Sequence, residues 1–194
     1  MQKRTFLKSM SGLVAAAAIG TPAAAMAAAG GAKHRIAFVY FSKTGNTASV
    51  AKAAQHMTGC DLFEVKTVKP YPEAYTPTTE IVKEELEKGV IREIQPLDID
   101  LSKYDVVALA SPTWWHHNAQ PLLTWVEAHA KELSGKLVIT CNTHGGGGLM
   151  HTREDFEKLL KDSGAKLGTH LTVFGGVSEN DSDVRDWLAD NGLL

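Results

Sequence analysis

Residues 35–41 form a short run that is almost entirely apolar, β-branched or aromatic, and a polar loop follows it at once. A strand of this composition is covered on both faces, as the strands of a parallel sheet are. After the loop, the alanine-rich stretch 48–57 has the composition of a helix. A buried strand, a short loop and a helix in this order predict a β-α unit of an α/β fold.

The same alternation continues from Lys33 to the C-terminus without an internal repeat. The predicted strands are residues 35–41, 62–65, 104–110, 137–140 and 171–174. The predicted helices are residues 48–57, a helix opening at Thr76 and Pro77, residues 121–129, a helix with a capping box at Thr152 and Asp155, and a final helix around residues 184–188. Strict alternation predicts an α/β domain with a five-stranded parallel sheet and helices on both faces.

Length and composition agree with a single domain of this kind. The chain has 194 residues, of which 44% are hydrophobic and 22% are charged, so it can bury one core. Its two cysteines are too few for a disulfide scaffold or for a cysteine-built zinc site.

The first 27 residues have the pattern of a cleavable export signal. A basic start is followed by the apolar run 12–19 and by small residues that end at Ala25-Met26-Ala27. The apolar run is too short and too rich in alanine for a membrane anchor. We therefore expect residues 1–27 to be removed, residues 28–34 to form a short linker and residues 35–194 to form the domain.

The basic start of the signal bears on the route and the partners. Residues 3–8 resemble a twin-arginine signal, with Lys3 where the first arginine belongs, and an ordinary secretory signal is the alternative. Both routes predict an exported, periplasmic protein. Cleavage would remove basic charge only, and no basic run remains, so nucleic acid and anionic membranes are poor partners. A small molecule or another protein is the expected partner.

Three polar loops follow the predicted apolar strands, at residues 42–47, 111–120 and 142–149. In a parallel α/β sheet, ligands bind beyond the carboxyl ends of the strands, where these loops should meet.

The first loop has the composition of a phosphate site. A glycine allows a tight turn, main-chain N–H groups at a helix start attract an anion, and hydroxyl and amide side chains add donors. The candidate residues are Ser42, Lys43, Thr44, Gly45, Asn46 and Thr47. The glycine patterns of nucleoside-triphosphate and dinucleotide sites are absent from the sequence. A capped polar turn without a ligand is the alternative.

Residues 39–47 resemble the signature of the flavodoxin family, in which this loop holds the phosphate of FMN. Residues 111–115 and 143–146 are similar to a flavodoxin-like subfamily that carries a double tryptophan in its second loop. The match extends from about Arg35 to the C-terminus. It implies a flavodoxin-like, doubly wound sheet of strand order 2-1-3-4-5 and FMN as the cofactor.

The second loop suits the flat, apolar ring of a flavin. An indole of Trp114 or Trp115 can lie against the ring and exclude water, while the other indole packs. The alternative is that both indoles belong to the core. The candidate residues of this loop are Pro112, Thr113, Trp114, Trp115 and His116.

The third loop is rich in glycine, which lets main-chain N–H groups approach the pyrimidine edge of a flavin and favour the charge of the reduced ring. Its candidate residues are Asn142, Thr143, His144, Gly145 and Gly146. A flexible solvent loop is the alternative. Tyr71 and Tyr75 either cover the opposite face of the ring or only pack.

The histidines of these loops do not have the spacing of a metal site, and no metal is predicted. We expect His144 or His116 to act as a hydrogen-bond or proton donor beside the flavin.

Two functions of different classes follow. The protein is either an electron carrier whose partners are redox proteins, or a flavin-dependent oxidoreductase that reduces quinones or similar small acceptors. Because nicotinamide donors are cytoplasmic, an exported reductase would need another electron source. A flavin-free binding module is a third alternative.

Overall fold

The computed structural model describes residues 34–194. The predicted export signal, residues 1–27, and all of the predicted linker except its last residue lie outside this part of the chain. Among the described helices, none is both long enough and apolar enough to cross a membrane.

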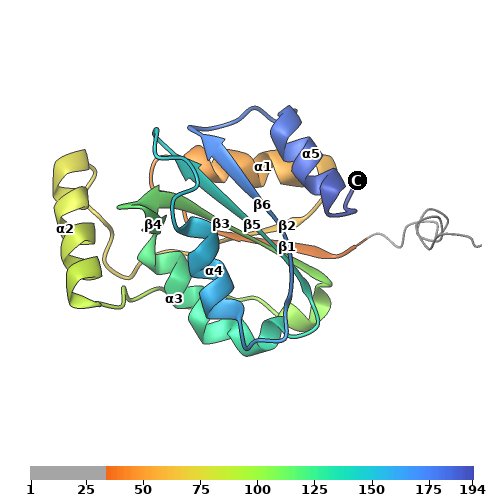
Figure 1. The fold of residues 1–194 in the computed structure, drawn as a ribbon, viewed down its shortest axis with the longest axis horizontal. Coiled ribbons are helices and arrows are strands. Elements are labelled where there is room, and N and C mark those ends of the chain that lie inside the picture. Colours follow the sequence, from red (N-terminus) through yellow and green to blue (C-terminus); the bar gives the residue numbers. More distant parts are fainter. Residues whose placement is uncertain (1–33) are drawn as a thin grey trace, which may run out of the picture. The chain divides into compact units, whose positions relative to one another are not determined.

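Five parallel strands form the centre of the domain in the order β2-β1-β3-β5-β6 (Figure 1). Their bounds are Ile36–Tyr40 for β1, Asp61–Glu64 for β2, Val106–Trp114 for β3, Leu137–His144 for β5 and Lys166–Phe174 for β6. Counted along the chain, these are the five predicted strands in the predicted order 2-1-3-4-5. The flavodoxin-like α/β fold class is confirmed.

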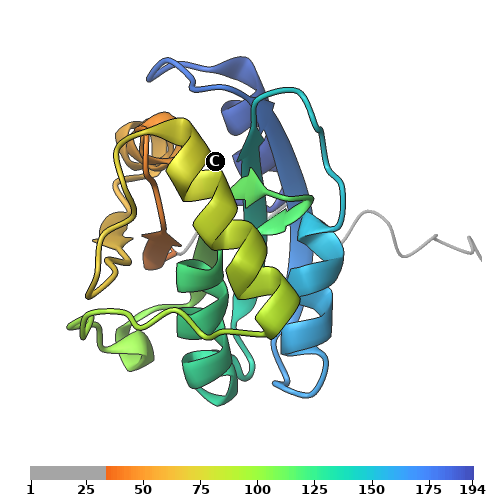
Figure 2. The same cartoon turned by 90° about the vertical axis from the view of Figure 1, so that its left-hand side faces the viewer.

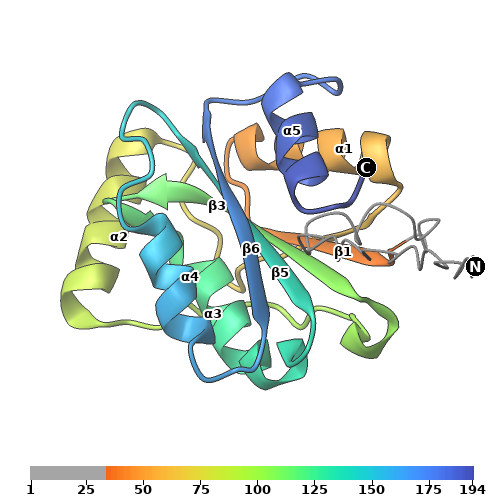
Figure 3. The same cartoon turned by 45° about the vertical axis from the view of Figure 1, so that its right-hand side comes forward.

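Helices cover both faces of the sheet, as Figure 3 shows. Helices α1 (Asn46–Thr58) and α5 (Ser182–Asp190) lie on one face, and α3 (Gln120–His129) and α4 (Thr152–Leu160) lie on the other. Two short 3-10 helices, Leu101–Lys103 and Ala130–Leu133, complete the connections.

The position of β1 between two layers of helices explains why its sequence is apolar throughout. Ile36, Phe38 and Tyr40 pack into the core under α1 and α5. Ala37 and Val39 pack into the second core, under α3 and α4. Because successive side chains of a strand point to opposite faces, a strand with a helical layer on each side needs apolar residues throughout.

Helix α2 (Tyr75–Lys88) stands at the edge of the domain, beyond the carboxyl ends of the strands (Figure 2). A largely buried polar cluster fixes its C-terminal half. Glu85 accepts hydrogen bonds from Arg92 Nη1 at 2.7 Å and from the Tyr71 hydroxyl at 2.7 Å. The Arg92 guanidinium also lies 4.1 Å from the centre of the Tyr71 ring. Burial, followed by the hydrogen bond to Glu85, raises the pKa of Tyr71 well above its usual value, so its hydroxyl remains a donor.

The predicted loop 111–120 is wrong in its first half. Strand β3 continues to Trp114, because Ser111 and Pro112 pair with Asn142 and Thr143 of β5. The chain then folds back as a short antiparallel strand, β4 (His117–Asn118). Pro112 made the segment look like a loop, since proline is disfavoured inside a sheet.

One strand start and one helix cap also differ from prediction. Strand β6 begins at Lys166 rather than at residue 171, because it is an edge strand whose first half is polar and largely exposed. The capping box of α4 is also wrong. The N-cap is His151, and the Asp155 carboxylate accepts instead from the main-chain N–H of Asn118 at 2.9 Å.

Candidate functional site

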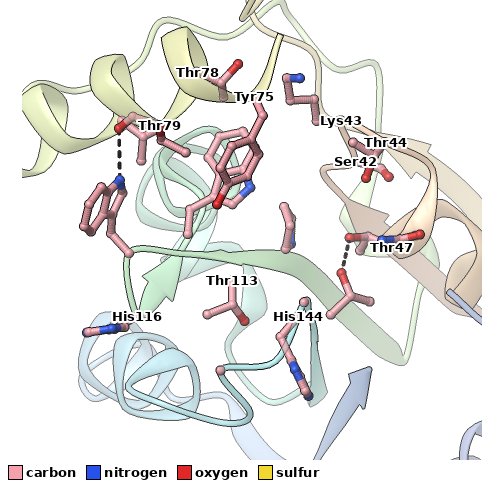
Figure 4. A pocket seen from close by; sticks show the side chains of 18 of the residues that line it. Ser42, Lys43, Thr44, Thr47, Tyr75, Thr78, Thr79, Thr113, His116 and His144 are labelled. Carbon is pink, nitrogen blue, oxygen red and sulfur yellow. Dashed lines mark hydrogen bonds between the residues drawn. The ribbon is translucent and has the colours of Figure 1, made fainter. Parts of the chain in front are cut away.

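A pocket of about 560 Å³ opens beyond the carboxyl ends of β1, β3 and β5, facing α2 (Figure 4). The three predicted loops meet in it. The predicted residues that line the pocket are Ser42, Lys43, Thr44, Asn46, Thr47, Pro112, Thr113, Trp114, Trp115, His116, Thr143, His144 and Gly145. Gly45, Asn142 and Gly146 do not line it.

The first loop presents main-chain donors to the pocket. Gly45 is the N-cap of α1 and has φ 90°, a left-handed conformation that glycine adopts without steric cost. The Ala48 N–H donates to Ser42 Oγ at 3.2 Å, which closes the turn. The N–H groups of residues 44–47 have no hydrogen-bond acceptor within residues 34–194. Together with the positive end of the α1 dipole, they form a cradle for an anion.

Side chains attach this cradle to the rest of the pocket. Thr47 is buried, and its hydroxyl shares a 2.8 Å hydrogen bond with the Thr143 hydroxyl of β5 (Figure 4). Lys43 Nζ donates to the Glu73 carbonyl at 2.8 Å, so the loop before α2 is held close to the cradle. The Thr44 side chain is exposed and faces the pocket.

The β3–β4 hairpin turns through two residues with unusual backbone conformations. Trp115 has φ 47° and His116 has φ 73°. A two-residue hairpin that needs positive φ at both positions normally carries Asn-Gly or Asp-Gly. Bulky side chains in this region cost about 1–3 kcal/mol each, and such strain is concentrated at functional sites.

Contacts with two helices hold this strained turn. The Trp115 indole N–H donates to the Thr79 carbonyl of α2 at 2.9 Å (Figure 4). On the other side, the His151 N–H donates to the His116 carbonyl at 3.0 Å. Asp155 Oδ1 lies 2.9 Å from His117 Nδ1, which joins the returning strand to α4.

The structure separates the two adjacent tryptophans. The Trp114 ring packs edge-on against Phe41, at 5.5 Å, and against Tyr71, at 5.0 Å. The Trp115 ring is 48% exposed, and Lys83 Nζ lies 5.9 Å from its centre. Trp114 is therefore the fixed aromatic wall of the pocket, and Trp115 lies at its rim.

Tyr71 and Tyr75 also occupy different environments. Tyr75, at the start of α2, is 82% exposed and lines the pocket, whereas Tyr71 packs behind Trp114. The packing alternative holds for Tyr71.

The third loop is shorter than predicted, because β5 runs to His144. Gly146, with φ 136°, donates its N–H to His144 Nδ1 at 3.0 Å. A neutral His144 ring then carries its proton on Nε2. Asn142 is completely buried and lies behind the pocket wall rather than on it.

Five residues that line the pocket were not predicted for the site: Thr78, Thr79, Val82, Gly147 and Met150. The first three belong to α2, which was predicted as a helix with Val82 on its apolar side. No sequence motif marks the hydroxyls of such a helix as part of a site.

His117 and His151 stack on each other, with ring centres 5.2 Å apart, and each faces its own carboxylate. Within residues 34–194, histidine, cysteine, aspartate and glutamate do not form a group of three or more that is placed to hold a metal ion.

The fold and the pocket define a doubly wound α/β protein with a helix-start anion cradle next to an aromatic wall. The family profile of the flavodoxins matches residues 35–191, and the chain belongs to the flavodoxin family. A search of curated proteins found no match.

Solved structures share this fold. A flavoprotein from Lactobacillus acidophilus, solved in complex with FMN, has a TM-score of 0.65 and 23% identity, covering 79% of this chain and 98% of its own. A protein from Bacteroides eggerthii has a TM-score of 0.64 and 24% identity, covering 80% of this chain and 96% of its own. A protein from Bacteroides uniformis has a TM-score of 0.65 and 20% identity, covering 80% of this chain and 98% of its own. At these identities, the likeness establishes the fold.

Proposed function

We propose that the protein binds FMN in the pocket and transfers electrons between redox partners. The observation that carries the proposal is the pairing of an N–H cradle at the start of α1 with an aromatic wall in one pocket. A phosphate fits the cradle and a flat apolar ring fits the wall. The flavoprotein from Lactobacillus acidophilus, similar in fold, was solved with FMN.

The residues present fit FMN part by part. The N–H groups of residues 44–47 and the hydroxyls of Ser42 and Thr44 would hold the phosphate. The indole of Trp114 or of Trp115 would lie against the ring. When bound, FMN supplies one- and two-electron redox chemistry.

The chain's own residues provide the environment for that chemistry. Trp114, packed on Phe41 and Tyr71, excludes water from one wall of the pocket. A neutral His144 ring, with its proton on Nε2, can donate a hydrogen bond to the ligand. The N–H groups around Gly145 would add donors that favour negative charge on the reduced ring.

The proposal extends to location and role. The pattern of residues 1–27 supports export to the periplasm, by a twin-arginine-like or secretory route. There, an electron carrier that works with redox proteins needs no nicotinamide donor. Anaerobic assays with quinones and with candidate donor proteins would distinguish this role from that of a quinone-type oxidoreductase.

The test of FMN binding uses Thr44, which is exposed, faces the pocket and makes no side-chain hydrogen bond to another residue of the described chain. Thr44→Val should weaken FMN about ten- to a hundredfold, because a hydrogen bond to a charged group contributes about 1.5–3 kcal/mol. Riboflavin, which lacks the phosphate, should bind the variant and the native protein equally. Titration of the protein against each flavin, followed by flavin fluorescence, measures both constants.

Thr76→Val is the matched control, because Thr76 is also exposed but lies outside the pocket. It should leave both constants unchanged. An equal loss of FMN and riboflavin in Thr44→Val would show that the loop does not hold the phosphate. A purified protein that neither carries FMN nor takes it up would overturn the proposed function.

A further inference from the structure

A chain of polar side chains crosses the sheet directly behind the pocket. It runs from Thr140 on β5 to His170 on β6, back to Asn142 on β5, and then to Thr113 on β3. The Thr140 hydroxyl lies 2.7 Å from His170 Nδ1, and His170 Nε2 lies 2.8 Å from Asn142 Oδ1. Asn142 Nδ2 donates to Thr113 Oγ1 at 2.7 Å. The Thr113 side chain lines the pocket (Figure 4).

The direction of every hydrogen bond in this chain is determined by one main-chain carbonyl. Asn142 Nδ2 also donates to the Gly148 carbonyl at 3.1 Å. A carbonyl oxygen can only accept, so the amide nitrogen of Asn142 must face Gly148 and Thr113, and its oxygen must face β6. The Thr172 hydroxyl donates to the same Asn142 oxygen at 2.9 Å, which agrees with this orientation.

The orientation of the amide sets the tautomer of His170. Because Asn142 Oδ1 can only accept, His170 Nε2 must carry a proton. In the neutral ring, Nδ1 then has a lone pair and accepts from the Thr140 hydroxyl. Burial, with a smaller effect of Arg153, lowers the pKa of His170 to about 4, so the ring is neutral at physiological pH.

At the other end, the orientation of the amide sets the polarity of Thr113. Its oxygen already accepts the Asn142 N–H, so its own hydroxyl proton remains available to donate. Within residues 34–194, no acceptor takes that proton, and the side chain faces the pocket.

We infer that Thr113 is a hydrogen-bond donor of fixed polarity to the pocket's ligand, and that Asn142 and His170 are positioning residues that impose this polarity. The ligand is the flavin of the proposed function, on which this inference rests. A donor beside a ring oxygen or nitrogen stabilises the reduced, more negatively charged form of a flavin. Asn142 and His170 therefore favour reduction without reaching the pocket themselves.

The first experiment tests the polarity in the protein without flavin. Nitrogen-15 NMR of the imidazole side chains distinguishes the two neutral tautomers, and His170→Gln assigns the signal. The expected result is that His170 is protonated at Nε2 and unprotonated at Nδ1 at pH 7. Protonation at Nδ1 would reverse the amide of Asn142 and overturn the inference, whether or not the protein binds FMN.

The second experiment tests the donor with FMN bound. Thr113→Val removes the donor at nearly constant shape, and Thr113→Ser keeps it. Thr113→Val should lower the reduction potential of bound FMN and weaken reduced FMN about two- to tenfold more than oxidised FMN, as expected for one hydrogen bond. Thr113→Ser should retain the native potential, and an unchanged potential in Thr113→Val would overturn the inference.

A double-mutant cycle tests whether Asn142 acts through Thr113. An aspartate at position 142 offers the Thr113 hydroxyl an acceptor, which would turn that hydroxyl away from the ligand. Asn142→Asp should lower the potential in the native background and have a much smaller effect in the Thr113→Val background. Equal effects in both backgrounds would show that Asn142 does not act through Thr113.

These outcomes separate the two proposals. If FMN does not bind the native protein, the proposed function fails while the tautomer of His170 still tests the polarity of the chain. If FMN binds and the Thr113 variants share one potential, the function holds and this inference fails. Should Asn142→Asp not fold, the Thr113 pair and the tautomer still decide the outcome.

Discussion

The pocket has two sides that are built in opposite ways. At the cradle, residues 42–47, the position with positive φ is Gly45, and a serine closes the turn. At the hairpin, the two positions with positive φ are Trp115 and His116. The cradle adopts a conformation that its own sequence prefers, whereas the hairpin adopts one that its sequence resists.

The difference shows where each conformation comes from. The cradle needs little beyond its strand and helix, because glycine and the Ser42 hydroxyl satisfy the turn locally. The hairpin depends on distant partners: Thr79 on α2, and His151 and Asp155 at the start of α4. Changes far from the pocket should therefore disturb the hairpin side and leave the cradle unchanged.

The largest expected effect comes from the polar cluster that fixes α2. Glu85→Ala would leave the Arg92 guanidinium largely buried without its partner, because the Glu85 and Arg92 side chains are only 6% and 13% exposed. Loss of one partner of a buried pair costs about 3–5 kcal/mol. The free energy of unfolding, measured with urea, should fall by about this amount.

Glu84→Ala is the control, because the Glu84–Lys88 pair lies on the exposed side of the same helix. It should leave the urea midpoint unchanged. At an intermediate urea concentration, the exposed Trp115 should lose its native fluorescence before the main-chain amides of the cradle lose their protection from hydrogen exchange. Simultaneous loss on both sides would mean that α2 supports the whole pocket equally.

An intermediate effect is expected from acid. The pKa of His170 is about 4 in the folded protein and 6.5 in the reference state, so the unfolded chain binds more protons between these values. Stability is therefore complete above pH 6.5 and is lost as the pH falls toward 4. Between pH 7 and pH 5, the free energy of unfolding should drop by about 2 kcal/mol.

His170→Gln removes the titrating group and should lose this part of the pH dependence. The polar chain from His170 ends at Thr113, which pairs with Asn118 at the base of the hairpin. Protonation of His170 should therefore affect the hairpin side of the pocket and not the cradle. If the free energy of unfolding of the native protein changed with pH as it does in His170→Gln over this range, the lowered pKa of His170 would be contradicted.

The smallest effects should have opposite signs on the two sides. His116→Gly relieves a left-handed conformation and should raise the free energy of unfolding by about 0.5–1 kcal/mol. Gly45→Ala should lower it by about 1 kcal/mol. A Cβ at Gly45 meets no atom within 4 Å, so this cost is purely conformational. Thermal unfolding measures both changes. If the two substitutions changed stability in the same direction, the proposed difference between the hairpin and the cradle would be contradicted.

The same contrast explains what could be predicted from sequence. The five strands, the five helices and the cradle follow from local pattern, since apolar period, helix starts and glycine act over a few residues. The strand order does not, and it was expected only from the resemblance to the flavodoxin family. The hairpin could not be predicted, because Pro112 argues against a strand and Trp115-His116 argues against a tight turn. Asn142 was placed on the pocket surface by its position after a strand, but its side chain turns to β6, which only the pairing of β5 with β6 determines.

The hydrogen bond from Trp115 to the Thr79 carbonyl joins a helix outside both hydrophobic cores to the rim of the pocket. A helix with so little apolar anchorage opens at a lower free energy than the sheet, so its amide hydrogens exchange through local rather than global unfolding. A ligand that fills the space between Trp115 and Val82 would close those openings. Occupancy of the pocket would thus be recorded in the folding equilibrium of a single helix.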